Sequence, residues 1–243
     1  MNTPESALNA PRGKVILLHG IGHILFFSHR KLQRELVRAG YAVRFLRYPS
    51  TRFSIEELAD DHLAPVVRDV AAQAPVDAPV HFVTFSMGGL LARCFLARHA
   101  LPQLGRVVMI APPNGGSDWV DHLGRLPGFR MVYGPSGVQM STHPQALPKA
   151  LPPASYECGV IAGKLPGCSL LRPVFRGDAS DGTVSVSSTR LAGMKEHCVV
   201  PGLHALLYRS PPVIERTLRF LAEGRFNAPQ PSKASLQLQR EAI

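Results

Sequence analysis

Residues Val80–Gly89, VHFVTFSMGG, decide how this chain folds. The first six of these residues are almost continuously apolar, which predicts a short strand buried on both faces. The run Leu90–His99, LLARCFLARH, follows at once and has the apolar spacing of a buried helix. Ser86 would therefore stand at the sharp turn between a central strand and a buried helix.

A serine in that position is typical of the turn called a nucleophile elbow, which presents a hydroxyl above the edge of the sheet. The usual pattern is G-x-S-x-G, and here Gly88 fills the second glycine position. Thr84 stands at the first, where its small side chain is a tolerable departure. The sequence at this point leaves two interpretations open, a nucleophile and an inert turn serine.

The rest of the chain repeats the order of strand then helix. Strands are predicted at Lys14–Leu18, Tyr41–Leu46, Arg106–Ile110, Glu157–Ala162 and His197–Val200, and helices at Ser28–Ala39, Ile55–Ala74 and Ala205–Leu221. Ser54 and Glu57 form a capping box at the start of the second of these helices, and Pro65 should bend it. Continuous apolar strands alternating with helices predict a mostly parallel sheet of about six strands with helices on both faces.

The chain of 243 residues has 45% hydrophobic and 18% charged residues, which suits one α/β domain. We expect this domain to span residues 1–222 and a polar C-terminal tail to occupy residues 223–243. Residues 111–153 are rich in glycine and proline, with one short helix expected at Asp118–Leu123. They predict a loop-rich excursion near one end of the sheet, and no large cap domain.

Charge and composition limit the partners and the compartment. The 27 lysines and arginines exceed the 17 acidic residues, giving a formal net charge of +10, but they are scattered, and we expect no nucleic-acid site. The positive charge instead predicts weak contact with an anionic lipid surface. The sequence shows no signal peptide, and Val15–Phe27 is too short to span a bilayer, so we expect a cytoplasmic protein.

The four cysteines lack the spacing of a metal site or a redox motif. Cys94, Cys158, Cys168 and Cys198 form no C-x-x-C pair, which favours free buried thiols. A bridge between Cys158 and Cys168 stays open as an alternative.

A serine nucleophile needs a base and a carboxylate that orients the base. His204 directly follows a predicted strand, in VVPGLHALLY, and the carboxyl ends of parallel strands are where α/β sheets place their sites. Two carboxylates, Asp178 and Asp181, lie in the loop RGDASDG, and either can also be read as a simple turn residue. We favour Asp181 because Gly182 and Thr183 follow it.

Four separated segments, LLHGIGH at 17–23, TFSMGG at 84–89, DGTVSV at 181–186 and PGLHALLYRSPPVIERTLRFL at 201–221, together resemble the α/β-hydrolase superfamily. Within it, the chain is similar to compact bacterial lipases and esterases that lack a large cap. The resemblance implies a catalytic triad, with Ser86 as nucleophile, Asp181 as acid and His204 as base. It also implies an oxyanion hole made by the backbone N–H groups of Ile21 and Met87.

The resemblance implies a carboxylic-ester hydrolase that needs no metal or organic cofactor. Ile24, Leu25, Trp119 and Leu203 flank the expected site and would suit an apolar acyl group of a small-molecule ester. An acyltransferase or thioesterase with the same triad is one alternative, and a non-catalytic binding protein on this fold is another.

Two further residues near the expected site have structural interpretations. Ser117, in APPNGGSDWV, is expected to cap a short helix. His19 is expected to fix the oxyanion loop, with a metal pair of His19 and His23 as a minor alternative.

Overall fold

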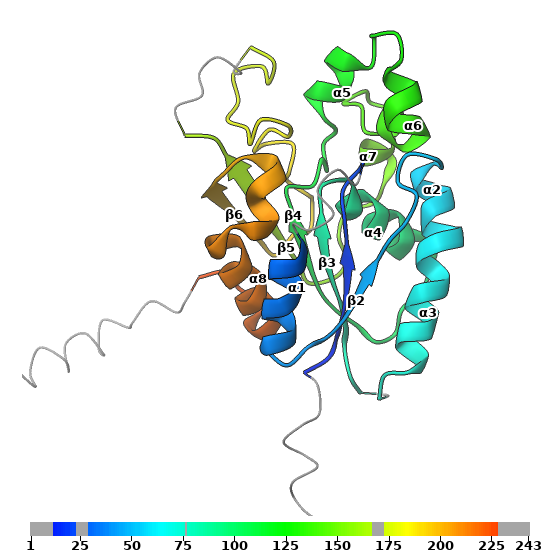
Figure 1. The fold of residues 1–243 in the computed structure, drawn as a ribbon, viewed down its shortest axis with the longest axis vertical. Coiled ribbons are helices and arrows are strands. Elements are labelled where there is room, and N and C mark those ends of the chain that lie inside the picture. Colours follow the sequence, from blue (N-terminus) through cyan, green and yellow to red (C-terminus); the bar gives the residue numbers. More distant parts are fainter. Residues whose placement is uncertain (1–11, 23–28, 76, 167–172, 228–243) are drawn as a thin grey trace, which may run out of the picture.

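A computed structural model describes residues 12–22, 29–75, 77–166 and 173–227. Its strands are β1 (Lys14–Leu18), β2 (Ala42–Leu46), β3 (Val80–Phe85), β4 (Leu104–Ile110), β5 (Cys158–Lys164) and β6 (Glu196–Pro201). They form one sheet in the order β2-β1-β3-β4-β5-β6, and each neighbouring pair is parallel (Figure 1). The predicted fold class is confirmed, and the strand that precedes Ser86 lies between β1 and β4 in the middle of the sheet.

Helices cover both faces of this sheet. They are α1 (His29–Arg38), α2 (Ile55–Glu57), η2 (Leu58–Leu63), α3 (Ala64–Ala72), α4 (Met87–Arg98), α5 (Asp118–Leu123), α6 (Phe129–Gln139), α7 (Leu147–Ala150), η3 (His204–Arg209) and α8 (Pro211–Glu223). Alternate residues of β1 enter different cores, as a strand buried on both sides requires. Val15 and Leu17 pack with α1 and α8, whereas Ile16 and Leu18 pack with α2, α3 and α4.

The predicted helix between β2 and β3 is present, with an irregular middle. The capping box forms as expected, with Ser54 Oγ accepting from Glu57 N at 3.2 Å and Glu57 Oε2 accepting from Ser54 N at 2.8 Å. The six residues of η2 are wound as π-helix just before Pro65. Proline has no N–H to continue the regular ladder, so the helix departs from α geometry over this turn.

The predicted final helix, Ala205–Leu221, is wrong as a single element. Residues His204–Arg209 form the 3₁₀-helix η3, Ser210 is extended, and α8 begins at Pro211. Two consecutive prolines supply no N–H to the preceding turn, so they end one helix and begin the next. Phe226, within the expected C-terminal tail, is buried against Phe220 with ring centroids 4.9 Å apart.

The excursion between β4 and β5 contains more helix than predicted. Besides the expected α5 it holds α6 and α7, and α5 and α6 lie together beyond the carboxyl ends of the central strands (Figure 1). Gly134 breaks the helical geometry of α6 with φ 66° and ψ −169°. A Cβ at Gly134 would lie only 1.6 Å from the carbonyl oxygen of Thr51, so the kink seats α6 against the loop after β2.

Cys94, Cys158 and Cys198 are free thiols, and Cys168 lies outside the described residues. Burial raises the pKa of the Cys158 thiol to about 12, so this thiol is an unreactive core group. Cys158 is not part of a disulfide, so the alternative of a bridge to Cys168 is not supported.

In the part of the chain that the structure describes, every helix is too short or too polar to span a bilayer.

Candidate active site

Ser86 occupies the turn between β3 and α4 in a strained backbone conformation. Its φ of 52° and ψ of −126° lie outside the regions that a residue with a Cβ ordinarily adopts. Ser86 N donates to Ile110 O of β4 at 2.8 Å, and Gly89 N donates to Ser86 O at 2.9 Å. These two bonds hold the turn in place, as a nucleophile elbow requires.

The turn accommodates Thr84 at the first glycine position of the motif. The close approaches fall instead at Gly88, where a Cβ would lie 2.7 Å from His19 O, and at Gly89, where it would lie 2.8 Å from Pro112 Cβ. Thr84 is fully buried within β3. The turn therefore requires glycine only after the serine.

The structure brings Ser86, His204 and Asp181 together from three distant segments. His204 Nε2 lies 3.1 Å from Ser86 Oγ, and His204 Nδ1 lies 2.7 Å from Asp181 Oδ2. His204 follows β6 at the start of η3, and its backbone N–H donates to Asp181 O at 2.9 Å. The imidazole is thus placed between a hydroxyl and a carboxylate, as a general base requires.

The two candidate carboxylates have different environments. Asp181 is fully buried, and its Oδ1 accepts from Thr183 N at 3.0 Å and from Val184 N at 2.8 Å, which leaves Oδ2 for His204. Asp178 accepts from Ala179 N at 2.7 Å. Burial alone would raise the pKa of Asp178, but hydrogen bonds from the loop outweigh it and lower that pKa. Only Asp181 contacts the histidine.

Two backbone N–H groups near Ser86 are available as donors. Met87 is the first residue of α4, where an N–H has no partner within the helix and the helix dipole is positive. Ile21 lies in the turn after β1, and the adjacent Gly20 approaches Ser86 so closely that a Cβ would lie 3.1 Å from Ser86 Cβ. Within the described residues, neither Ile21 N nor Met87 N donates to a protein acceptor. These are the two donors predicted for an oxyanion hole.

Buried aromatic residues hold the loop that carries Ile21. His19 stacks on Tyr48 with ring centroids 3.9 Å apart, and its Nδ1 lies 2.6 Å from Gly20 O. The Tyr48 hydroxyl donates to His19 O, and the Tyr208 hydroxyl donates to Leu18 O at 2.6 Å. Burial raises the pKa of both phenols, so they remain protonated donors at any ordinary pH.

His19 is 5% exposed and packs against the rings of Tyr48 and Phe45. Across the described residues, His, Cys, Asp and Glu side chains form no group of three that could hold a metal ion, and His23 lies outside them. The supporting tyrosines carry no sequence signal of their own, because their role depends on loops that meet only in the fold.

A cavity of about 560 Å³ opens beside Ser86 and His204. Its far wall comes from α5, α6 and the residue after α6, namely Trp119, Val120, Leu123, Phe129, Tyr133 and Met140. This wall is apolar except for the tyrosine hydroxyl and the indole N–H, and the indole N–H of Trp119 is occupied by donation to Gly182 O. The space is of a size that binds small molecules.

The sequence-predicted lining residues have different outcomes. Trp119 lines the cavity, whereas Leu203 does not: its side chain is 45% exposed and borders a separate surface groove with Lys31 and Leu206. Ile24 and Leu25 lie outside the described residues. Phe129, Tyr133 and Met140 were missed by sequence reasoning, because glycines and a proline hide the helical period of α6.

Ser117 differs from expectation in one respect. It occupies the N-cap position of α5, but its hydroxyl makes no capping bond and donates to Thr183 O at 3.2 Å, which links α5 to the loop that carries Asp181.

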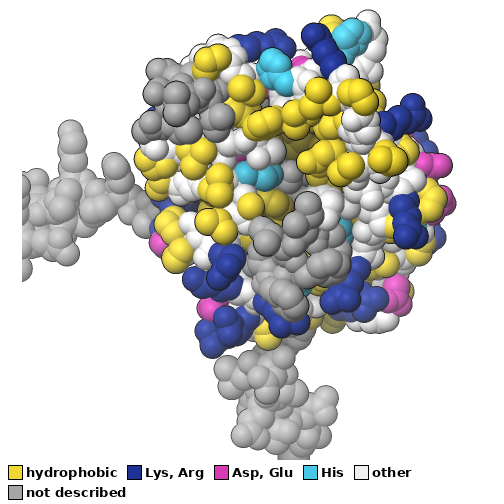
Figure 2. Space-filling model, turned by 45° about the horizontal axis from the view of Figure 1, so that its top comes forward, with side chains coloured by type: hydrophobic (Ala, Val, Ile, Leu, Met, Phe, Trp, Pro, Cys, Tyr) yellow, Lys and Arg dark blue, Asp and Glu magenta, His cyan; other side chains and the backbone are white. Residues whose placement is uncertain are grey.

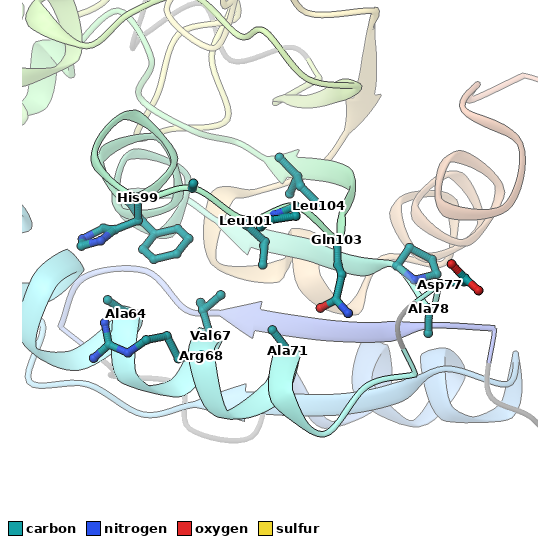
Figure 3. A pocket seen from close by; sticks show the side chains of 14 residues that line it. Ala64, Val67, Arg68, Ala71, Asp77, Ala78, His99, Leu101, Gln103 and Leu104 are labelled. Carbon is teal, nitrogen blue, oxygen red and sulfur yellow. The ribbon is translucent and has the colours of Figure 1, made fainter.

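A larger cavity, of about 810 Å³, lies at the other end of the sheet between α3 and the turn from α4 to β4 (Figure 3). Its walls include Val67, Leu101 and Leu104, with Arg68 and His99 at its side. It is next to the amino ends of β3 and β4, whereas Ser86 follows the carboxyl end of β3. The carboxyl ends carry the chemistry in α/β sheets, so the smaller cavity is the candidate site.

One buried arginine connects the helix after Ser86 to the excursion. Arg93 of α4 is 4% exposed; its Nη1 donates to Asn114 O at 3.3 Å and its Nη2 donates to Leu151 O at 3.0 Å. Burial lowers the pKa of this guanidinium, whose hydrogen-bond acceptors are all neutral oxygens. Because Asn114 and Leu151 lie near the two ends of the excursion, Arg93 fixes both to α4.

Solved structures similar to this chain include a lipase and an esterase. The lipase BlEst2 of Bacillus licheniformis matches in its propeptide form with a TM-score of 0.69 and 17% identity over 91% of this chain and 53% of that one. Its mature form matches with a TM-score of 0.63 and 17% identity over 93% and 94%. The metagenomic carboxyl esterase MGS0156 gives 0.60 and 16% identity over 95% and 76%.

The type II thioesterase YbtT of the yersiniabactin pathway gives a TM-score of 0.57 and 15% identity over 90% of this chain and 96% of that one. At these identities the similarities show the fold, and the chain spans about half the length of the propeptide form of the lipase. A comparison with curated protein sequences finds no match.

The model of the alpha/beta hydrolase family matches residues 15–193, from strand β1 to just before strand β6. The matched region includes both Ser86 and Asp181. The parallel sheet, the strained serine turn after β3 and this match lead to one conclusion: the chain belongs to the alpha/beta hydrolase family.

Proposed function

We propose that this protein hydrolyses carboxylic esters through an acyl-enzyme formed on Ser86. The observation that carries the proposal is the continuous set of contacts from Ser86 Oγ to His204 Nε2 and from His204 Nδ1 to Asp181. A serine hydroxyl is a weak nucleophile until a base accepts its proton, and the imidazole lies at the distance this transfer needs.

In the first half of the reaction, Ser86 Oγ attacks the ester carbonyl as His204 Nε2 takes its proton. Asp181 holds the imidazole in the tautomer that presents a free Nε2 to the serine, and it stabilises the imidazolium that forms. The negative charge on the carbonyl oxygen is bound by the N–H groups of Ile21 and Met87. Each such donor contributes about 3 to 4 kcal/mol to transition-state binding in comparable sites.

In the second half, the ester's alcohol leaves with the proton from His204, and the acyl group stays on Ser86. Water then gives a proton to His204 and attacks the acyl carbonyl. The second tetrahedral intermediate collapses, the proton returns to Ser86, and the carboxylic acid leaves. The residues present complete this cycle with substrate and water alone.

The cavity favours substrates with an apolar acyl or aromatic group. Phe129 and Met140 are buried, and with Leu123 they form part of a wall that would exclude water from the acyl chain. The names of the structural relatives, a lipase and a carboxyl esterase, are consistent with this substrate class.

A thioesterase or acyltransferase is the second candidate, since it uses the same acyl-enzyme and differs in the leaving group or in the acceptor. The thioesterase YbtT shares the fold. Comparing kcat/KM for matched oxygen and sulfur esters, and analysing products with a competing alcohol present, separates these reactions. A binding protein without turnover would show none of them.

A fluorophosphonate probe tests the proposal directly. It should modify the protein once, at Ser86, and the Ser86→Ala variant should be unlabelled and should lose at least about 10³-fold in the hydrolysis of short p-nitrophenyl esters. Ser117→Ala is the matched control, because Ser117 is also buried and also borders the cavity. Labelling of Ser86→Ala, or hydrolysis by it at the parent rate, would refute the assignment.

A further inference from the structure

The outer side of α6 and the turn before it expose large apolar side chains to solvent. Leu126 is 57% exposed, Met131 86% and Val132 62%. The cavity is lined by other residues of the same helix, Phe129 and Tyr133. The exposed residues therefore lie on the outer surface of the element whose inner surface forms the wall of the candidate site.

Exposed arginines alternate with these apolar residues. Arg125 precedes Leu126, and Arg130 precedes Met131 and Val132; we call these five residues the α6 rim. In the part of the chain that the structure describes, neither arginine of the rim forms an ion pair. Arginines without an ion pair can bind negative groups, and the exposed apolar side chains beside them can enter an apolar layer. Together they suit a partner whose surface is anionic and whose interior is apolar.

The same pairing continues on the neighbouring loop. Phe53 is 38% exposed and follows the exposed Arg52, and this loop packs on the kink of α6 at Gly134. Two acids, Glu56 and Glu57, follow on the next helix and keep their negative charge, because their hydrogen-bond partners Gln139 and Ser54 are neutral. The loop therefore adds one exposed aromatic ring and one arginine beside the rim, and the arginines of the rim itself carry the positive charge.

Figure 2 looks onto this end of the molecule. Hydrophobic side chains gather around a hollow, and lysine and arginine side chains stand at the margins of the same face. An isolated exposed apolar residue is ordinary on a protein surface, but a contiguous group beside a cavity marks a surface that contacts another phase or molecule.

We propose that the α6 rim docks on an anionic phospholipid bilayer, with Leu126, Met131 and Val132 entering the interface and Arg125 and Arg130 contacting lipid phosphates. Apolar insertion and electrostatic attraction add in this mode of binding. A bilayer fits because exposed apolar side chains and exposed arginines alternate along one short segment, so both can reach an interface whose surface is anionic and whose interior is apolar. The formal charge of +10 supports the same attraction.

Vesicle sedimentation with the full chain tests the proposal. The parent should bind vesicles that contain phosphatidylglycerol, bind vesicles of phosphatidylcholine alone much less, and dissociate as salt is raised. Replacing Met131 and Val132 together by aspartate should lower binding at least about tenfold. Arg125→Gln and Arg130→Gln should lower it about fivefold each.

Val37 and Arg38 provide a control at a distant site, where Arg38 pairs with Glu35 at 2.8 Å. Val37 is 55% exposed beside an arginine on α1, far from α6 (Figure 1). Val37→Asp and Arg38→Gln should leave binding unchanged. Every variant should keep the parent's circular dichroism and its turnover of a soluble short ester, because none of these residues lines the cavity. Ser86→Ala should bind as the parent does, so failure of the proposed reaction leaves this test intact.

Three results would overturn the proposal. The first is a parent that does not bind anionic vesicles, and the second is an equal loss of binding in the rim and control variants. The third is a parent that self-associates in a concentration-dependent way that the Met131 and Val132 substitutions abolish, which would make the rim an interface between two copies of this chain.

Discussion

The backbone of Ser86 carries strain at the point where the proposed chemistry takes place. A φ of 52° with a Cβ present costs about 1 to 3 kcal/mol, and the surrounding turn must hold it. The carbonyl of Ile110 does so by accepting from Ser86 N. The backbone strain and the hydroxyl proposed as nucleophile belong to the same residue, and different substitutions of Ser86 remove one or both of them.

Two substitutions at this position should differ in stability. Ser86→Gly removes the Cβ and tolerates a positive φ, whereas Ser86→Ala keeps the Cβ, so glycine should be the more stable variant by about 1 kcal/mol. Urea unfolding of both proteins measures the difference, and both should lack turnover. An alanine variant as stable as the glycine variant would show that the turn is unstrained.

The two carboxylates of the RGDASDG loop give a second test at this scale. Asp181→Asn should lower kcat on the order of 10⁴-fold, because an amide can no longer select the required imidazole tautomer or stabilise its charged form. Asp178→Asn should retain the parent rate within a small factor, since Asp178 bonds only to its own loop. Steady-state kinetics on one ester separates them, and a reversed order of effects would assign the acid to Asp178.

Residues with local signals could be predicted from the sequence. Ser86 lies between an apolar strand and glycines, and His204 follows an apolar strand, so each could be recognised from its neighbours; their catalytic roles stay predictions. Tyr48 and Tyr208 could not be found this way. Their hydroxyls bond to carbonyls of residues 18 and 19, and that contact exists only after β1, β2 and η3 have packed together.

Among the elements, α6 determines how much of the site is enclosed. It supplies Phe129 and Tyr133 to the cavity, and Met140 follows it directly. Ser136 Oγ donates to Ser50 O, so the helix is fixed to the loop after β2 on its other side. A side chain on α6 therefore changes the depth of the pocket without touching Ser86.

Met140→Trp should shorten the acyl pocket. The larger side chain should lower kcat/KM for long-chain esters about tenfold or more relative to short-chain esters. The end of a long acyl chain would lose its contacts with the pocket, and one or two methylene groups in an apolar pocket change kcat/KM by about that factor. Met131→Trp is the control, since Met131 lies outside the cavity. A uniform loss across all chain lengths would instead indicate damage to the fold.

The success of prediction at this scale follows from side-chain periodicity. The strands β1 and β3 and the helices α1 and α4 have regular apolar spacing, and they were found within a few residues. Helix α6 was missed because Gly134 and Pro135 remove that spacing, and tertiary contacts with Thr51 stabilise the kink. Pro211 and Pro212 mark the split between η3 and α8, because neither proline has an N–H to continue the preceding turn.

For the molecule as a whole, one buried histidine links stability to pH. His81 at the start of β3 is 4% exposed, and its Nδ1 accepts from Arg106 N at 2.8 Å. Burial, followed by the nearby Arg106 guanidinium, lowers the pKa of His81 from 6.5 to about 4. The folded protein therefore keeps this imidazole neutral, while the unfolded chain protonates it below about pH 6.5.

The sign of the effect follows from proton uptake by the unfolded chain. Stability is fully present above about pH 6.5 and is lost as the pH falls toward 4, by on the order of 3 kcal/mol from this group. Urea midpoints across that range measure it. His81→Gln should flatten the acid branch, whereas His143→Gln, at an exposed site, should leave it unchanged. An equally steep acid branch in His81→Gln would assign the loss to other groups.

The overall architecture could be predicted because it depends on the order of strands and helices along the chain and not on individual side-chain contacts. Alternating apolar strands and helices permit few arrangements, and a parallel sheet covered on both faces is the principal one. The closure of the site could not be predicted, because it arises from residues 111–153, where loops and short helices are fixed by individual contacts. These residues form much of the cavity wall that faces Ser86.

The bonds of Arg93 make the excursion a replaceable cassette. The chain leaves the sheet near Asn114 and returns to it near Leu151, and both residues bond to the Arg93 guanidinium. The 36 residues between them therefore begin and end at a common anchor. A segment grafted between these two points would keep this anchor, and it would have to rebuild the contacts with the loop of Asp181 and with the loop after β2. Laboratory evolution of new specificities would accordingly gain most from exchanging this cassette as a unit, with Arg93 left in place.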